Sequence, residues 1–294
     1  MEVVPFPIAK EYEKHRDITP EDIARIKEWL HTQPHLPAQH ITDMDILLVY
    51  NCCRGSLERT KQLLDTNYTL RTMFPNHFGN RCLNEHSERI MNSVLFAALP
   101  PTPQGYRSVY CRLIDLDPKN FNFTESVHAV MMMLDLWQYE EGTWPGFIII
   151  IDMHGSSLKH IAKVDINSLR QALYFMQEGI LVILKAVHFI NAPPFMDTVM
   201  TLVKPFAKKH LMDRLQVHAV GSETIYESVP KECFPKDLGG GYKTYELKEK
   251  IRANEKFFKE EEKQRVQESL RPGGKRTMPE TFGTEGSFKK LDID

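Results

Sequence analysis

The turn after the most apolar run of the chain carries side chains that could act in acyl transfer. It reads His154-Gly155-Ser156-Ser157 and follows Asp152. A serine hydrolase holds its nucleophile in a Gly-x-Ser-x-Gly turn, because only small flanking residues fit the tight bend from strand to helix. This turn lacks that spacing. A hydrolase would require esterase activity that is lost when Ser156 or Ser157 becomes Ala, and we expect no catalytic residue here.

The histidines and cysteines do not form a metal-ligand pattern. The chain holds 12 His and 5 Cys, but no His pair at i, i+4 encloses a glutamate and no Cys/His ligand cluster occurs. His188 lies in an apolar strand pattern, so we expect a hydrogen-bonded core histidine. Gly239-Gly240-Gly241 lacks the Lys-Ser/Thr of a phosphate-binding loop and predicts a turn. We expect neither a metal nor a cofactor.

A set of basic residues is the third group that could do chemistry. The set consists of Lys185, Lys204, Lys208, Lys209, His210 and Arg214. Basic side chains attract anionic membranes, at roughly 1 kcal/mol per residue near the surface. A solvated helix face is the alternative, and the residues alone leave both interpretations open. The vicinal pair Cys52-Cys53 could likewise sense redox state or consist of two idle thiols.

A predicted βαβ unit positions these groups. Residues 147–151 and 180–184 are unbroken apolar runs separated by a helical pattern. A strand that is buried on both faces has a continuous run of apolar residues rather than an alternation of apolar and polar ones. The crossover between two parallel strands needs about a dozen residues or more. The sequence therefore predicts two parallel strands, with Lys185 at the end of the second.

An amphipathic segment follows Pro193-Pro194. The apolar side chains that recur there at helical spacing are Phe195, Val199, Leu202 and Phe206. This spacing predicts a helix over residues 195–206 with one apolar face. Pro205 removes a backbone donor, which favours a helix end or kink at Lys204.

Three motifs occur in a fixed order along the chain. They read Phe-Ile-Ile-Ile-Ile-Asp-Met-His-Gly from residue 147, His-Phe-Ile-Asn-Ala-Pro from residue 188, and Val-Pro-Lys-Glu-Cys-Phe-Pro-Lys-Asp-Leu-Gly-Gly from residue 229. These motifs resemble the core strand, the next strand with its lid helix, and the closing turn of CRAL-TRIO lipid-binding domains. The resemblance spans roughly residues 18–245 and is strongest to the family members that carry tocopherol and retinaldehyde.

The resemblance implies a lipid cavity beneath a lid formed by residues 195–206. The residues expected to line the cavity and lid are Met131, Leu134, Ile149, Leu184, Phe195, Val199, Met200 and Val203. It also implies that the basic set binds phosphoinositide headgroups, and it carries over best for Lys185 and Arg214. His210 stands where the family has a lysine, which weakens that contact or makes it pH-dependent.

The chain is expected to have an N-terminal helical module over residues 1–92. Thr19, Thr42 and Ser56 are helix caps that predict its three helices, and residues 1–16 are expected to be a loose lead-in. The module is similar to the one that precedes the CRAL-TRIO domain. Relatives carry a basic segment where this chain keeps only Arg54, so the module is not expected to contact anionic lipid.

The lipid-binding domain is expected over residues 93–245, with its first strand at Tyr106–Asp115 and a helix capped by Asn122. Beyond it, residues 246–294 change in character. Charged residues alternate with a narrow apolar stripe up to Gln267, which predicts one surface helix. Pro, Gly, Thr and Ser dominate from Arg271 onward, so a disordered tail is expected.

Composition narrows the class of protein. The chain has 294 residues and a formal net charge of −2, which argues against a general nucleic-acid binder because phosphate neutralisation needs a basic field. No apolar run approaches the ~20 residues of a membrane span. An odd number of cysteines and an N-terminus without a signal-peptide pattern favour a cytoplasmic protein that visits membranes reversibly.

The predicted fold is α/β, with a mostly parallel sheet flanked by helices that enclose a lipid cavity, preceded by the three-helix module. The predicted function is that of a non-enzymatic carrier, which binds a tocopherol-like molecule, a retinoid or another lipid and exchanges it at phosphoinositide-containing membranes. The alternative is a lipid-gated adaptor that recruits a protein partner through the charged helix at 246–267.

Overall fold

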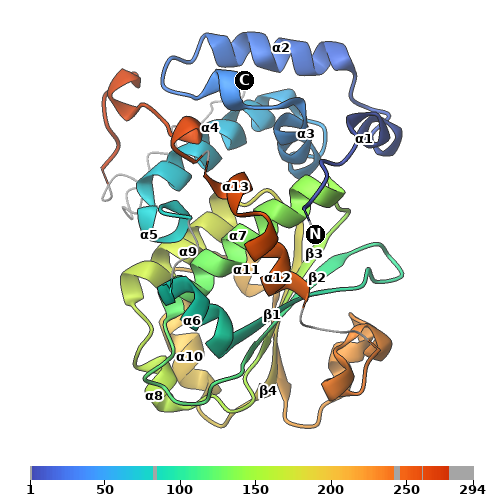
Figure 1. Cartoon of the computed structure of the whole chain (residues 1–294), viewed down its shortest axis with the longest axis vertical. Coiled ribbons are helices and arrows are strands. Elements are labelled where there is room, and N and C mark those ends of the chain that lie inside the picture. Colours follow the sequence, from blue (N-terminus) through green and yellow to red (C-terminus); the bar gives the residue numbers. More distant parts are fainter. Residues whose placement is uncertain (1, 82–84, 242–245, 260, 278–294) are drawn as a thin grey trace.

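A mixed sheet forms the centre of the computed structural model, which describes residues 2–81, 85–241, 246–259 and 261–277 (Figure 1). The sheet has 5 strands in the order β1-β2-β3-β4-β5. β1 pairs antiparallel with β2, and the other neighbours pair in parallel. The strands are β1 (Val94–Leu99), β2 (Arg107–Leu113), β3 (Phe147–Asp152), β4 (Leu184–Ala192) and β5 (Leu215–Ala219). The predicted fold class is confirmed.

Helices surround this sheet. Before it come α1 (Ile8–Lys14), α2 (Pro20–His31), α3 (Asp43–Cys52), α4 (Leu57–Met73), α5 (Pro75–Phe78) and α6 (Glu85–Ser93). Between and after the strands come α7 (Phe123–Glu141), α8 (Leu158–Ile161), α9 (Ile166–Glu178), α10 (Met196–Val203), α11 (Lys209–Met212), α12 (Glu246–Ala253) and α13 (Glu255–Phe258). Helices α7, α9 and α10 cover one face of the sheet. The opposite face is covered by short 3-10 helices at Thr224–Glu227, Lys231–Cys233 and Lys236–Leu238.

The N-terminal helices begin where their caps predict. The side chains of Thr19, Thr42 and Ser56 each accept a backbone N–H from the first turn of α2, α3 and α4. The inward faces of these helices share a core of their own that includes the fully buried Ile26 and Ile46. The three predicted helices are therefore confirmed.

The prediction for residues 1–16 is wrong, because α1 lies within them and is anchored to the body of the protein. Glu11 is fully buried, and its carboxylate accepts bonds from the Thr143 backbone N–H (3.1 Å) and hydroxyl (2.6 Å). Lys14 donates to the same carboxylate at 2.6 Å. The partner of Glu11 lies 132 residues away in the sequence, so local composition could not reveal this anchor.

The second predicted strand is wrong in register. The apolar run 180–183 precedes β4, which begins at Leu184. Side chains of neighbouring helices hold the backbone of this run in a bend: Asn67 donates to the Gly179 carbonyl (2.6 Å) and Gln138 to the Leu181 carbonyl (2.6 Å). The run is apolar because Ile180 and Val182 pack into the helical core rather than because it forms a strand.

The first strand of the sheet also differs from the prediction. Tyr106–Asp115 contains β2, but β1 precedes it and pairs antiparallel along the edge, with Val94 opposite Leu113 and Leu99 opposite Ser108. A short apolar run directly after a helix has no turn signal to mark it as a strand. The Pro-rich link that follows Leu99 is the connection between β1 and β2.

The C-terminal segment is not one surface helix. It consists of α12 and α13, then 3-10 helices at Glu261–Gln264 and Glu268–Leu270 that return to the N-terminal module. The predicted apolar stripe is confirmed for Ile251 and Phe258, which are buried in the core around α7. Arg271 is buried and ion-paired with Asp65 at 2.5 Å, so the chain is still ordered at this point. The predicted disorder of 278–294 falls outside the described residues.

Candidate functional site

An apolar cluster lies between α10 and the sheet. It contains six of the eight residues predicted to line the cavity and lid, namely Ile149, Leu184, Phe195, Val199, Met200 and Val203. The pleat of the sheet explains this grouping, because Ile149 pairs with Val187 and Ile151 with Phe189, which sets these side chains on the face beneath α10. Helix α10 ends at Val203 with Lys204 as its C-cap, as Pro205 predicted.

The other two predicted residues belong to an adjoining cluster. Met131 and Leu134 are buried on α7 among Trp137, Phe147 and Phe175. Ile149 and Leu184 pack against both clusters. The eight residues therefore form a continuous apolar region that runs from α7 across the sheet to α10.

Three side chains in the middle of this region are only partly buried. Ile149 lies on the central strand and yet keeps accessible surface, and so do Ile151 and Cys111 on the same face. Burial raises the pKa of the Cys111 thiol to about 12. The surrounding protein therefore covers these three side chains incompletely.

The sequence analysis missed several members of this region. Val187 and Phe189 alternate along β4 and point toward α10, and Met196 and Leu211 are buried beside them. The alternation along 187–189 was the available signal. The motif from residue 188 was compared with a strand of the family, and β4 includes it, but its alternating residues were not assigned to the cavity.

A polar corner closes the carboxyl end of β3. The Asp152 carboxylate accepts bonds from the His154 backbone N–H (2.9 Å), the Asn191 side-chain amide (2.8 Å) and the Tyr110 hydroxyl (2.5 Å). Asp152 is therefore a structural residue that holds this corner of the sheet. Each acceptor oxygen is occupied by structural partners.

The serines of the adjacent turn also have structural partners. Ser156 donates its hydroxyl proton to the Met153 carbonyl at 2.6 Å. The Ser157 hydroxyl lies 2.9 Å from His160 Nδ1 as part of a capping box at α8. This Ser-His contact is a cap across one helical turn, and no oxyanion site accompanies it among the described contacts.

His188 is a fully buried core histidine, as predicted. Its Nδ1 lies 2.9 Å from Nε2 of His218, whose Nδ1 lies 2.7 Å from the Thr224 hydroxyl. This chain of contacts joins β4 and β5 to the segment that covers the opposite face of the sheet. Burial, with a smaller contribution from His218, lowers the pKa of His188 to about 4.

Stability is expected to fall in acid because of His188. Its folded pKa of about 4 lies below the ordinary 6.5 of an unfolded histidine, so the unfolded state binds more protons between these values. The stabilisation is complete above pH 6.5 and is lost as pH falls toward 4, by up to about 3 kcal/mol. Urea unfolding at pH 7 and pH 5 measures the free energy of unfolding of the wild type and of His188→Gln. The loss between the two pH values should be smaller in the variant, and an equal loss would contradict the assignment.

The basic set lies at the amino-terminal edge of β4 and β5. Lys185 is the second residue of β4, so the prediction that it ends the strand is wrong, for the register reason given above. The Arg214 carbonyl accepts the Val187 N–H at 2.9 Å, which brings the end of α11 beside the start of β4. Lys204 caps α10 at its C-terminal end.

Acidic partners neutralise part of this set. Lys208 is ion-paired with Glu178, and Lys209 with Asp213 at 2.8 Å. The Arg214 guanidinium donates to the His210 carbonyl. Lys185 and Lys204 are exposed, and the Lys185 ammonium lies 4.9 Å from the centre of the Tyr106 ring. Among the described residues, no ion pair joins Lys185, Lys204 or Arg214 to an acid.

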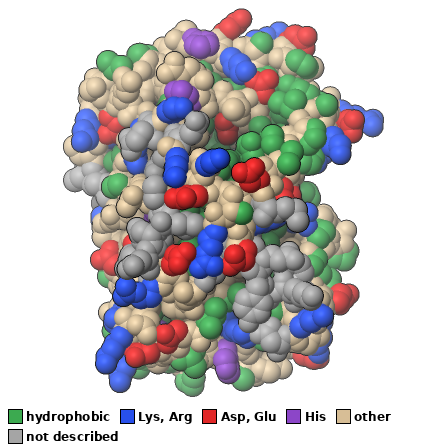
Figure 2. All heavy atoms as spheres, viewed as in Figure 1, with side chains coloured by type: hydrophobic (Ala, Val, Ile, Leu, Met, Phe, Trp, Pro, Cys, Tyr) green, Lys and Arg blue, Asp and Glu red, His purple; other side chains and the backbone are tan. Residues whose placement is uncertain are grey.

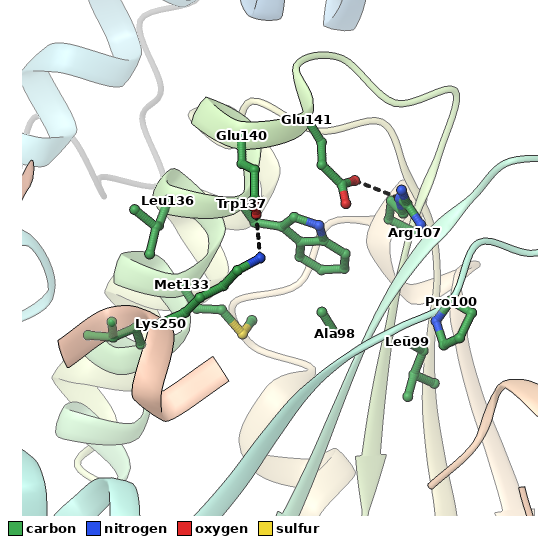
Figure 3. Close-up of a pocket in the computed structure, with 11 residues that line it drawn as sticks. Ala98, Leu99, Pro100, Arg107, Met133, Leu136, Trp137, Glu140, Glu141 and Lys250 are labelled. Atoms are coloured by element: carbon green, nitrogen blue, oxygen red, sulfur yellow. Dashed lines mark hydrogen bonds and ion pairs between the residues drawn. The ribbon is translucent and has the colours of Figure 1, made fainter. Parts of the chain in front are cut away.

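A small pocket of about 260 Å³ opens between α7, α12 and the β1–β2 hairpin (Figure 3). Trp137 and Met133 point into it from α7, opposite Ala98. Its acids are both paired: Glu140 accepts from Lys250 at 2.5 Å and Glu141 from Arg107 at 2.7 Å. These pairs fix α12 and β2 to α7, which makes the pocket a structural junction.

Within the described residues, no group of three or more His, Cys, Asp or Glu side chains could hold a metal ion. Burial raises the pKa of both Cys52 and Cys53, so neither thiol is activated as a thiolate. No helix in the described part of the chain is long and apolar enough to cross a membrane.

The fold and the site define an α/β protein with a helix-covered apolar region on one face of its sheet. The family model of the CRAL/TRIO domain matches residues 91–240, and that of the Pinta-like UBA domain matches residues 15–87. The chain belongs to the CRAL/TRIO family of lipid-binding proteins.

Two curated relatives and one solved structure show the extent of the similarity. Alpha-tocopherol transfer protein-like of Mus musculus is 25% identical over 221 residues, which cover 74% of this chain and 64% of that protein. Clavesin-1 of Xenopus laevis is 23% identical over 244 residues, 81% of this chain and 72% of that protein. The crystal structure of Sfh5 covers 82% of this chain and 90% of that one at 15% identity, with a TM-score of 0.48. The matched region thus spans less than two thirds of the tocopherol transfer protein-like relatives.

Proposed function

We propose that the protein binds a hydrophobic small molecule in the apolar region beneath α10 and exchanges it at phosphoinositide-containing membranes. The observation that supports binding most is the accessible surface of Ile149, Ile151 and Cys111 in the middle of the sheet. A tocopherol-like molecule, a retinoid or another lipid matches the apolar character of this region. No step in this function requires catalysis.

Release of such a ligand through water would be very slow. A lipid with about 20 buried methylene-like groups gains on the order of 16 kcal/mol from leaving water, at ~0.8 kcal/mol each. A carrier must therefore open where the lipid can pass directly into a bilayer. Helix α10 suits this role because Phe195, Val199 and Met200 are only half-buried and the helix ends before Pro205.

The exposed basic residues provide membrane attraction. Each contributes roughly 1 kcal/mol near an anionic surface, which is enough for docking and still permits departure. We expect Lys185→Glu/Lys204→Glu to slow transfer of a fluorescent ligand between phosphoinositide-containing liposomes roughly 30-fold, because about 2 kcal/mol of attraction is lost. Equilibrium affinity for the ligand should remain unchanged.

The matched control is Lys10→Glu/Arg16→Glu, which makes the same change in net charge at exposed positions of the N-terminal segment. It should transfer as the wild type does. Equal transfer rates in the wild type and the Lys185/Lys204 variant would remove these residues from the exchange step.

The match to a Pinta-like UBA domain favours a second function, in which the module recruits a protein partner when lipid is bound. The C-terminal segment already covers part of this module: Gln267 donates its N–H to the His35 carbonyl (2.8 Å), and Val266 to the Thr72 hydroxyl (2.9 Å). Deleting residues 246–294 would remove Ile251 and Phe258 and uncover the core around α7 against which they pack. Substitutions at exposed Glu249 and Lys259 are therefore the cleaner test. Loss of recruitment with normal lipid transfer would support the adaptor.

A further inference from the structure

The connection from β4 to α10 contains a residue in an unusual backbone conformation. Asn191 has a φ of 51°, in the left-handed region that residues other than glycine seldom adopt and that asparagine tolerates better than most. β4 pairs with β5 at Phe189 and Val217, and the next pair is Ala192 with Ala219. Between these pairs β4 has one residue more than β5. Such a β-bulge bends the strand and changes the direction of the chain that follows.

The side chain of Asn191 holds this conformation in place. Its amide donates to Asp152 Oδ1 at 2.8 Å, and the same oxygen accepts the His154 backbone N–H at 2.9 Å. The Ile190 carbonyl accepts the Met153 N–H at 2.9 Å. Asp152 is buried, and a hydrogen bond to a carboxylate is stronger than one between neutral groups. The carboxyl ends of β3 and β4 are therefore joined where the chain leaves for α10.

Two prolines stiffen the chain between Asn191 and α10. Pro193 and Pro194 each have a fixed φ. Ala192 and Pro193 each precede a proline, which confines both to extended conformations. The Pro193 carbonyl also accepts the Met196 N–H at 3.0 Å, which ties this stretch to the first residue of α10. Residues 192–194 thus form a stiff arm, and a backbone rotation at Asn191 swings α10 as a whole.

Helix α10 is held on the sheet by a modest set of contacts. Phe195, Val199 and Met200 belong to the apolar cluster beneath it but are only half-buried. Thr198 and Thr201 on its other side are exposed. Hydrophobic side chains lie at the surface among charged ones at the lower end of the view, where Figure 1 shows α8 and α10 (Figure 2). Because its outer side faces solvent, α10 can lift outward.

We propose that Asn191 is the hinge of α10 and that its bond to Asp152 sets how often the helix lifts. With the bond intact, the left-handed conformation directs residues 192–194 so that α10 lies on the sheet. When the amide leaves the carboxylate, Asn191 can return to the extended conformation that most residues prefer. The arm and α10 then swing away from the apolar cluster. The hinge rests on the proposed function only for what passes beneath α10, namely the hydrophobic ligand.

Hydrogen–deuterium exchange of the full chain, without added ligand, measures the lifting of α10. The helix has 8 residues, and isolated helices of this length are marginal in water, so its amides exchange when it leaves the sheet. Asn191→Gly accepts the left-handed conformation but lacks the amide, and should speed exchange in residues 196–203 roughly tenfold. Asn191→Ala also disfavours the left-handed conformation and should speed it roughly 100-fold.

Asn80→Gly is the matched control, because Asn80 also has a φ of 51° but lies beyond α5. It should leave exchange in α10 at the wild-type rate. Unchanged exchange in both Asn191 variants would overturn the proposal, and so would an equal acceleration in Asn80→Gly. An acceleration that extends equally to α2, α3 and α4 would also overturn it, because Asn191 would then support the fold as a whole.

Ligand dissociation separates the hinge from the proposed function. A retinoid or tocopherol analogue should leave Asn191→Gly for acceptor liposomes roughly tenfold faster than it leaves the wild type or Asn80→Gly. A wild type that binds no such ligand would refute the proposed function, whereas faster exchange in α10 of Asn191→Gly would still establish the hinge. Equal dissociation rates despite faster exchange in α10 would overturn the role of the hinge in release.

Discussion

Asp135→Ala is expected to lower the free energy of unfolding by about 3–5 kcal/mol, the usual cost of leaving a buried ionic partner uncompensated. The carboxylate is ion-paired with both Arg71 and Arg81, and all three side chains are largely removed from water. Without it, the two guanidinium groups lose the carboxylate that they share near the junction of α4, α5 and α7. Urea unfolding at pH 7 measures the loss.

Asp213→Ala is the matched control. Like Asp135, Asp213 is an acid in an ion pair, in this case with Lys209, but its side chain is 58% exposed. Its removal should therefore change the free energy of unfolding by less than about 1 kcal/mol. If the two variants lose similar stability, the Asp135 network does not hold the helices together.

Phe195→Asp/Val199→Asp is expected to abolish ligand binding and leave the fold intact. Both side chains lie in the apolar cluster beneath α10, and both are half-buried, so the substitutions remove few contacts. A bound lipid would cover them, and a carboxylate facing an apolar ligand costs several kcal/mol. We expect affinity to fall by roughly 100-fold or more. Binding is measured by fluorescence of a retinoid or tocopherol analogue.

Thr198→Asp/Thr201→Asp introduces the same two charges on the exposed side of α10. This control should bind the ligand as the wild type does, and circular dichroism should show equal helicity for both double variants. Unchanged affinity in the Phe195/Val199 variant would refute the role of α10 as a lid.

The sequence predicts correctly those features that depend on neighbouring residues in the chain. The caps at Thr19, Thr42 and Ser56 satisfy helix N-termini within three residues, and the unbroken Ile run of β3 reports burial on both faces. Errors arise where distant partners decide the structure. Gln138 and Asn67 hold the residues before β4 in a bend, and these bonds span 43 and 112 residues of sequence.

The sequence contains a partial signal of the ion pairs between Asp135 and its arginine partners. Asp135 interrupts the apolar run Met131-Met132-Met133-Leu134 and Leu136-Trp137 on α7, and a charge within such a run signals a buried partner. The sequence could not identify that partner, because Arg71 lies 64 residues away on α4.

Native mass spectrometry of the purified full chain, followed by extraction of whatever it carries, tests the central claim most directly. The proposed function predicts one hydrophobic molecule per chain, an isoprenoid, retinoid or other lipid, that is lost in Phe195→Asp/Val199→Asp. An empty protein that takes up none of a panel of tocopherol, retinoids, sterols and phosphoinositides would contradict the carrier function.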